Sequence, residues 1–198
     1  MPVSVTAPHI VVMGVSGAGK STVARSIAER TGASLLDADD LHPPGNRRKL
    51  RAGVPLTDSD RGPWLAAVRD RMREWDEPGP TGPHPPGPDI GLVLACSALR
   101  RAYRDVLREV RRPVFFVELR PDAELIAARL AARRGHFASE RILESQLRTL
   151  EPLDDDERGL VCPITMTPAE IAAEVLTAVG DRATPPEQLD SGRDPGPR

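Results

Sequence analysis

The chain has 198 residues, 39% of them hydrophobic and only 3% aromatic, which suffices for one α/β domain with a core of Val, Leu, Ile and Ala. Its 27 Lys and Arg nearly balance 29 Asp and Glu, and the net charge of −2 gives no reason to expect a nucleic-acid partner. No apolar run approaches the roughly 20 residues that span a membrane, and the start MPVSVTAPHI lacks the pattern of a signal peptide. We therefore expect a cytoplasmic protein with no membrane partner.

Strands and helices alternate along the chain in its apolar patterns. In chain order we expect a strand at 9–14, a helix at 20–30, a strand at 34–39, a helix at 60–75, a strand at 91–96, a helix at 99–110, a strand at 113–119, a helix at 122–134, a strand at 160–165 and a helix at 167–179. Such alternation predicts a three-layer α/β/α fold with a parallel sheet of about five strands. Ligands bind beyond the carboxyl ends of the strands in such sheets.

Several residues mark where these elements begin and end. Gly32 supplies a stop for the first helix. Asp60 is expected to cap the helix at 60–75 or one close to it, and Pro63 suits a first turn. Pro163 favours an edge position for the last strand, because proline cannot donate a ladder hydrogen bond. The spacing of residues 167–170 predicts a capping box at the start of the last helix.

Two stretches rich in Pro and Gly interrupt or follow this pattern. Residues 77–88, EPGPTGPHPPGP, predict an exposed loop, with a Pro-rich docking site as the alternative. The polar tail 181–198 is expected to be disordered, which leaves a single domain at 1–180.

The two cysteines, Cys96 and Cys162, lie far apart in apolar runs that are typical of strands. We expect both to be buried and reduced rather than joined in a disulfide. The sequence contains no evident cluster of metal-ligating residues.

The first expected strand runs directly into a phosphate-binding pattern, GVSGAGKS, which has the spacing G-x-x-x-x-G-K-[ST]. Its glycines let backbone N–H groups approach phosphate oxygens, and the following helix N-terminus adds to this anion site. Lys20 is expected to reach the β and γ phosphates, and the Ser21 hydroxyl to ligate Mg²⁺. The predicted nucleotide-binding residues are Gly14, Val15, Ser16, Gly17, Ala18, Gly19, Lys20, Ser21 and Thr22. This loop alone fits a small-molecule kinase, a GTPase, an ATPase or a nucleotide sensor.

Acidic residues lie at the carboxyl end of the second expected strand. Asp37 and Asp39 are two residues apart, so on an extended segment their side chains point the same way, toward the phosphate loop. One is expected to hold the Mg²⁺ hydration shell and the other to accept a proton from an attacking hydroxyl. The alternative is a solvated acidic turn that caps a helix.

Six segments in order, from Met13 to Pro152, resemble the gluconate kinase (gluconokinase) family, relatives of shikimate and nucleoside monophosphate kinases. They are MGVSGAGKST, LDADDLHP, NRRKLRAGVPLTDSDRGPWL, LACSALRRAYRDVLR, RLAARRGHF and SQLRTLEP. The resemblance implies ATP-dependent phosphorylation of D-gluconate at its 6-hydroxyl, giving 6-phosphogluconate and ADP. It also implies a P-loop core, a substrate-binding segment, a mobile lid at about 133–152 and a homodimer.

By this resemblance Asp39 is the base that orients and deprotonates the 6-hydroxyl, and Asp37 serves the Mg²⁺ shell. Because gluconate is a carboxylate on a polyol chain, it calls for cations and for polar partners to its hydroxyls. The predicted substrate contacts are Asp39, His42, Arg48, Lys49, Asp60, Arg61, Ser97, Arg100, Arg104 and His136.

Structural alternatives stay open for several of these residues. His42 is alternatively a helix-entry residue, Ser97 a helix cap, and Arg61 the partner of Asp60 in an ion pair. Trp64 is expected to pack in the core rather than form a platform for the sugar.

The expected lid carries Arg129 and Arg133 one helical turn apart, followed by Gly135. Arg133 is expected to close over the γ-phosphate and stabilise transition-state charge, while closure excludes water. Arg129 is assigned to the nucleotide, with stacking on adenine as one mode, and Gln146 is expected to hold the lid helix. A solvated helix face is the alternative for the two arginines.

Two other functions remain as alternatives. A kinase for another small polyol or sugar acid, such as shikimate, fits the phosphate loop, although the segments LHP and PLTDSDRGPW argue against shikimate itself. A non-catalytic nucleotide-binding module is expected to have lost Lys20, Ser21 or Asp39, all of which are present.

Overall fold

A sheet of five parallel strands forms the centre of the fold, in the order β2-β3-β1-β4-β5. The computed structural model describes residues 7–77, 90–122, 124–126 and 136–181, without the side chains of 136–139 and 181. The strands are β1 (His9–Met13), β2 (Ser34–Asp37), β3 (Leu92–Ala95), β4 (Val114–Arg120) and β5 (Gly159–Pro163). β1 and β3 are buried along their whole length, as expected for a parallel sheet covered on both faces.

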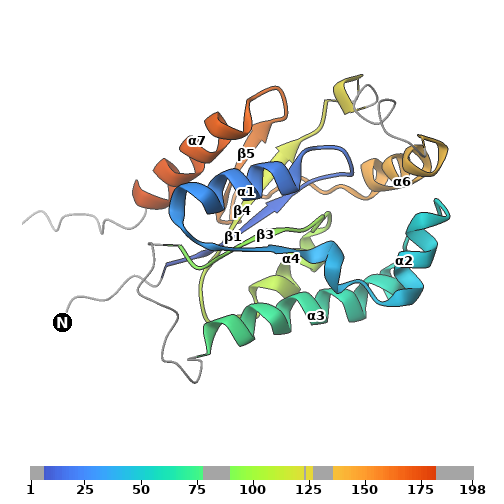
Figure 1. Ribbon diagram of the computed structural model, residues 1–198, viewed down its shortest axis with the longest axis horizontal. Helices are drawn as coiled ribbons and strands as arrows, with labels where there is room; N and C mark the ends of the chain where they lie inside the picture. The colour runs from blue at the N-terminus through green and yellow to red at the C-terminus, as the bar shows by residue number, and fades with distance from the viewer. Residues whose placement is uncertain (1–6, 78–89, 123, 127–135, 182–198) are drawn as a thin grey trace, which may run out of the picture.

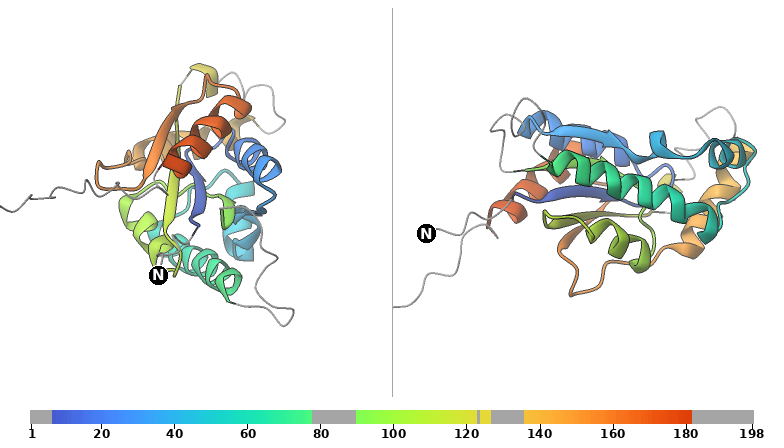
Figure 2. Two further views of the ribbon diagram at one scale, coloured as in Figure 1. Left: turned by 90° about the vertical axis from the view of Figure 1, so that its left-hand side faces the viewer. Right: turned by 90° about the horizontal axis from the view of Figure 1, so that it is seen from below.

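Helices cover both faces of this sheet, which confirms the predicted three-layer α/β/α architecture (Figures 1 and 2). They are α1 (Lys20–Thr31), α2 (Pro44–Arg51), α3 (Asp58–Asp76), α4 (Arg101–Arg108), α6 (His136–Thr149) and α7 (Pro168–Asp181), with a 3₁₀ helix η1 (Ala38–Leu41). Among the described residues, no helix is long and apolar enough to cross a membrane.

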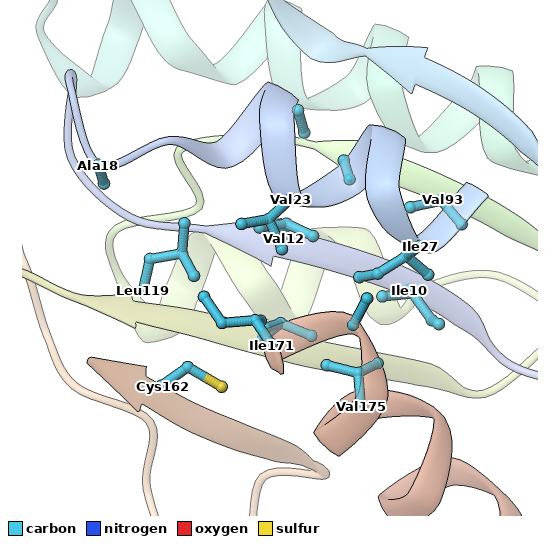
Figure 3. Close-up of a cluster of buried hydrophobic side chains, with 14 of the residues drawn as sticks. Ile10, Val12, Ala18, Val23, Ile27, Val93, Leu119, Cys162, Ile171 and Val175 are labelled. Atoms are coloured by element: carbon cyan, nitrogen blue, oxygen red, sulfur yellow. The ribbon is translucent and has the colours of Figure 1, made fainter. Parts of the chain in front are cut away.

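The two faces of the sheet have separate hydrophobic cores. On one face, α1 packs on β1 and β3, and α7 packs against α1 and β5, with Ile10, Ile27, Val93 and Val175 in one cluster (Figure 3). On the other face, α3 and α4 pack on alternate residues of the same strands, with Trp64 and Leu107 as large members. This alternation follows from the two-residue period of a strand. Two helices, α2 and α6, lie instead beyond the carboxyl ends of the strands (Figure 1).

Several sequence predictions about element ends are confirmed. Gly32 ends α1 in the left-handed region at φ 70°, and Pro163 lies on the edge strand β5. The capping box of α7 forms: the Thr167 amide donates to Glu170 Oε2 over 2.7 Å, and the Glu170 amide donates to Thr167 Oγ1. Both cysteines are buried and free, and burial raises the pKa of the Cys96 thiol to about 12.

Other predictions were wrong in their bounds. β2 ends at Asp37, and the next residues turn into η1 because the Asp37 side chain accepts a hydrogen bond from the Asp39 amide. α3 begins two residues before Asp60, and its cap is Thr57, whose side chain pairs reciprocally with Asp60. Pro63 therefore lies inside the helix.

The sequence analysis missed α2 altogether. The expected helix at 122–134 and the stretches 78–88 and 182–198 lie largely or wholly outside the described residues.

A buried ion pair holds the segment after α6 against α4. The Arg104 and Glu157 side chains are both 0% exposed, and Arg104 Nε donates to Glu157 Oε1 over 2.8 Å. Arg104 also donates to the carbonyls of Glu151 and Pro152 over 3.0 and 3.1 Å. Although burial acts to raise it, hydrogen bonds from Arg104, the Asp154 amide and Arg108 lower the pKa of Glu157 to about 2.

These contacts correct the prediction that Arg104 binds substrate. Its guanidinium is directed at a buried carboxylate and at backbone carbonyls, so it has no exposed surface to offer a ligand. The residue was misassigned because its partner lies 53 residues further along the chain.

We predict that Glu157→Gln lowers the free energy of unfolding by about 3–5 kcal/mol, because it leaves the Arg104 guanidinium buried without a counter-charge. Urea unfolding at pH 7 measures this change. The matched control is Asp156→Asn, which removes an exposed carboxylate paired with Arg101 and is expected to cost less than about 1 kcal/mol. Equal, small losses in the two variants would contradict a structural role for the buried pair.

Candidate active site

Residues 14–21 form a glycine-dependent turn between β1 and α1. Gly14, Gly17 and Gly19 have φ angles of 141°, 82° and 101°, where side chains other than glycine are strained. A Cβ on Gly14 would also lie 3.1 Å from the Leu119 carbonyl oxygen. The Lys20 ammonium donates to the Val15 carbonyl over 3.0 Å and lies at the first turn of α1. This geometry is that of a phosphate-binding loop at a helix N-terminus.

Asp37 and Ser21 lie together beside this loop. The Ser21 hydroxyl donates to Asp37 Oδ2 over 2.9 Å, so the expectation that Asp37 faces the loop is confirmed. Hard oxygen donors of this kind fit Mg²⁺, which keeps most of its waters and phosphate ligands and needs few protein groups. No group of three or more His, Cys, Asp or Glu in the described part of the chain is arranged to hold a metal.

Asp39 faces the same space for a different reason from the one expected. It lies in η1 rather than on an extended strand, and its side chain is 74% exposed. Its carboxylate borders a cavity of about 240 Å³, together with Lys20 of the phosphate loop. Six of the predicted site residues meet in the wall of this cavity: Ser16, Lys20, Asp39, His42, Arg61 and Ser97.

His42 is held in one tautomer at the cavity wall. Its ring stacks on Trp64 with centroids 4.3 Å apart, and Asn46 Nδ2 lies 3.3 Å from His42 Nδ1. Asn46 Nδ2 also donates to the Asp60 carbonyl over 2.8 Å, which identifies it as the amide nitrogen. His42 Nδ1 therefore accepts, and its proton lies on Nε2, 3.8 Å from Asp39 Oδ1. Burial is the main cause that lowers the pKa of His42, so the ring is a neutral donor at pH 7.

Trp64 packs as expected. It is 1% exposed, and its indole N–H donates to the Ala38 carbonyl over 2.7 Å. It supports the cavity from behind His42, on which it stacks.

Arg61 is a buried cation in the wall of this cavity. It is 7% exposed, its guanidinium lies 5.7 Å from the Tyr103 ring centroid, and Nη1 lies 3.6 Å from Asp58 Oδ1. The alternative pairing of Arg61 with Asp60 is wrong, because Asp60 pairs with Lys49 over 2.6 Å. Hydrogen bonds from Lys49 and Thr57 lower the pKa of Asp60 to about 2.

Four further predicted substrate residues do not line this cavity. Lys49 and Asp60 neutralise each other, Arg100 pairs with Asp58 over 2.8 Å, and Arg48 is exposed on α2. Their contacts with substrate are therefore not supported by this geometry. Arg129, Arg133 and the side chain of His136 lie outside the described residues.

The sequence analysis did not foresee that α6 completes the cavity. Ile142, Ser145 and Gln146 line it, and the Ser16 amide donates to Gln146 Oε1 over 2.5 Å. The segment SQLRTLEP pointed to a lid helix held by Gln146, and this contact confirms that Gln146 joins the helix to the rest of the protein. Leu50, Pro55 and Leu56 supply an apolar wall.

Comparison with known proteins shows which proteins the chain resembles. Residues 10–78 match the model of the AAA domain family. The chain is 47% identical over 148 residues to a gluconokinase of Gluconobacter oxydans, covering 75% of this chain and 78% of that protein. It is 39% identical over 173 residues to the thermoresistant gluconokinase of Escherichia coli, covering 86% and 93%. A crystal structure of a gluconokinase from Sinorhizobium meliloti superposes with a TM-score of 0.75 at 40% identity, covering 90% of this chain and 94% of that one.

We predict that His42→Gln flattens the pH dependence of stability. Below the ordinary His pKa of about 6.5 the unfolded chain binds a proton that buried, neutral His42 does not, so acidification destabilises the fold until the pH passes below the folded-state pKa. Urea unfolding at pH 7.5 and at pH 5.5 measures the loss in each protein. Burial also lowers the pKa of His9. Because His9 is present in the wild type and in the variant, its contribution to the loss of stability is the same in both and cancels in the comparison. An equal loss in the wild type and the variant would contradict the assignment.

Proposed function

The chain belongs to the gluconokinase family, and from that premise we propose that it transfers the γ-phosphoryl group of ATP to the 6-hydroxyl of gluconate, giving 6-phosphogluconate and ADP. One observation carries this proposal beyond the family name. A single cavity joins Lys20 of a phosphate loop to Asp39 and Arg61, so groups suited to a phosphate donor border the same space as groups suited to a sugar-acid acceptor.

The donor half is the phosphate loop. Its backbone amides and the N-terminus of α1 suit the phosphates of ATP, and Lys20 adds a positive charge at the cavity wall. Ser21 and Asp37 are the residues that would hold Mg²⁺, which neutralises phosphate charge when it is bound.

Asp39 is the base in the acceptor half. As the 6-oxygen forms its bond to the γ-phosphorus and the bond from that phosphorus to ADP breaks, the proton of the hydroxyl passes to the Asp39 carboxylate. His42 Nε2 lies 3.8 Å from Asp39 Oδ1, beyond hydrogen-bond distance.

Arg61 is proposed as the ligand of the gluconate carboxylate. Of the arginines predicted to bind substrate, it is the one in the wall of the described cavity. Its neighbour Asp58 is 60% exposed and 3.6 Å away, and it also accepts hydrogen bonds from Arg100 and Tyr103. The Arg61 charge is therefore only partly balanced within the protein, and a guanidinium pairs well with a substrate carboxylate.

The cavity shared by the two halves has a volume of about 240 Å³. A different small polyol acid, such as shikimate, is the second candidate. By family resemblance we also propose a cytoplasmic homodimer, although neither property enters the chemistry.

We predict that an ADP-release assay with a panel of acceptors shows turnover with gluconate and near-background rates with shikimate and nucleoside monophosphates. Glucitol tests the carboxylate contact, because it keeps the polyol chain but lacks the carboxylate. Arg61→Gln is expected to lower kcat/KM for gluconate by roughly 10- to 100-fold, the value of a charge-assisted hydrogen bond, and to leave the rate with glucitol unchanged.

The matched control is Arg48→Gln, which removes an exposed arginine outside the cavity and is expected to change little. Turnover of another acceptor with none of gluconate would refute the proposed function. A larger effect at Arg48 than at Arg61 would move the carboxylate site to α2.

We predict that Asp39→Asn lowers kcat by about 10²- to 10⁴-fold, because the amide cannot accept the hydroxyl proton. ATP affinity, measured by calorimetry, is expected to stay close to that of the wild type. Asp40→Asn is the control, since Asp40 is exposed and is not part of the cavity wall. Near-normal turnover by Asp39→Asn would remove Asp39 from the role of base.

A further inference from the structure

Gln146 occupies a position in the cavity that the roles assigned above do not use. It comes from α6, and it meets the phosphate loop 130 residues earlier in the chain, where the Ser16 amide donates to its Oε1. Both residues line the cavity with Lys20 and Asp39. Gln146 is thus next to the phosphate loop and borders the same space as the proposed base.

The hydrogen bond from Ser16 determines which way the Gln146 amide faces. A backbone N–H only donates, so the side-chain atom that meets it is the oxygen. The amide nitrogen Nε2, with its two N–H donors, therefore points away from the Ser16 amide. The hydrogen bonds found among the described residues include none from this nitrogen, so its donors are available to a ligand in the cavity.

A phosphoryl group in transfer carries negative charge on its three equatorial oxygens, and fixed donors aimed at that charge lower the barrier. Lys20 and Asp39 border the cavity from the donor and acceptor halves, and the phosphoryl group has to pass between the two halves. A neutral donor held there by the loop itself is preorganised, because the Ser16 amide restrains the rotation of the Gln146 side chain.

We propose that Gln146 is a further catalytic residue, whose Nε2 donates a hydrogen bond to the phosphoryl group as it passes from ATP to the acceptor hydroxyl. This inference rests on the proposed function for the presence of an acceptor, but not on the acceptor being gluconate. It also gives α6 a role in the reaction: the helix brings a donor to the phosphate loop and so completes the site.

Two variants separate this role from a structural one. Gln146→Glu keeps the chain length and the oxygen that accepts from Ser16, but replaces the donor with a negative charge. Gln146→Met keeps the approximate length and loses both functions. We expect kcat to fall by about 10²- to 10³-fold in Gln146→Glu, and by less in Gln146→Met. The affinity for ADP is expected to stay unchanged in Gln146→Met, because ADP lacks the transferred group.

The matched control is Leu147→Glu, which adds the same charge to α6 at a side chain that is 36% exposed and not part of the cavity wall. It is expected to keep the wild-type kcat. Thermal unfolding of all three variants reports whether any loss of activity reflects loss of structure.

Two results would overturn the proposal. If Gln146 only anchors α6, Gln146→Glu retains nearly full kcat while Gln146→Met has the lower kcat and the lower Tm. If its oxygen merely fills a phosphate position in the empty loop, Gln146→Met binds ADP more tightly than the wild type. Failure of the proposed function gives a different result, because the wild type itself does not phosphorylate gluconate. The variants are then compared with the wild type using the acceptor that turns over in the panel, or using basal ATP hydrolysis if no acceptor does.

Discussion

The parallel register of β1, β2 and β3 is the constraint on which the site depends. Ala95 of β3 pairs with Val12 of β1 on one side and with Asp37 of β2 on the other. The three strands therefore end at the same level, and the segments that follow them meet at one edge of the sheet. The phosphate loop, the Asp37–Asp39 turn and Ser97 come from these three ends, and hydrogen bonding between the strands brings them together across long stretches of sequence.

The segments beyond this edge are held by polar and ring contacts in addition to the two hydrophobic cores. Asn46 and Trp64 hold His42, and Asp58 and Tyr103 contact Arg61. The buried pair of Arg104 with Glu157 ties α4 to the segment that follows α6, and the Glu151 amide donates to the Leu99 carbonyl in the same region. The chemistry at the edge of the sheet thus rests on groups that are themselves fixed by neighbours.

Local features of the sequence predicted the donor half well. The glycine pattern, the strand before it and the helix after it are all set by neighbouring residues, and Asp37 ends a strand that must lie in the sheet. The acceptor half was harder, because the partner of each charge lies far along the chain. The sequence around Arg104 does not indicate that its side chain is buried in an ion pair with Glu157. The sequence around Asp60 does not distinguish Lys49 from Arg61 as its partner. α2 was missed because PGNRRKLR has one apolar residue and so no hydrophobic period.

The central claim is that one cavity holds the transferred phosphate and the sugar acid in a single orientation. The most direct measurement is a crystal structure of the protein with Mg²⁺, a non-hydrolysable ATP analogue and gluconate. The account predicts the 6-hydroxyl within hydrogen-bond distance of Asp39 and facing the γ-phosphate, with the carboxylate of gluconate on Arg61. Gluconate bound in the reverse orientation, or outside the cavity that joins Lys20 to Asp39, would contradict it.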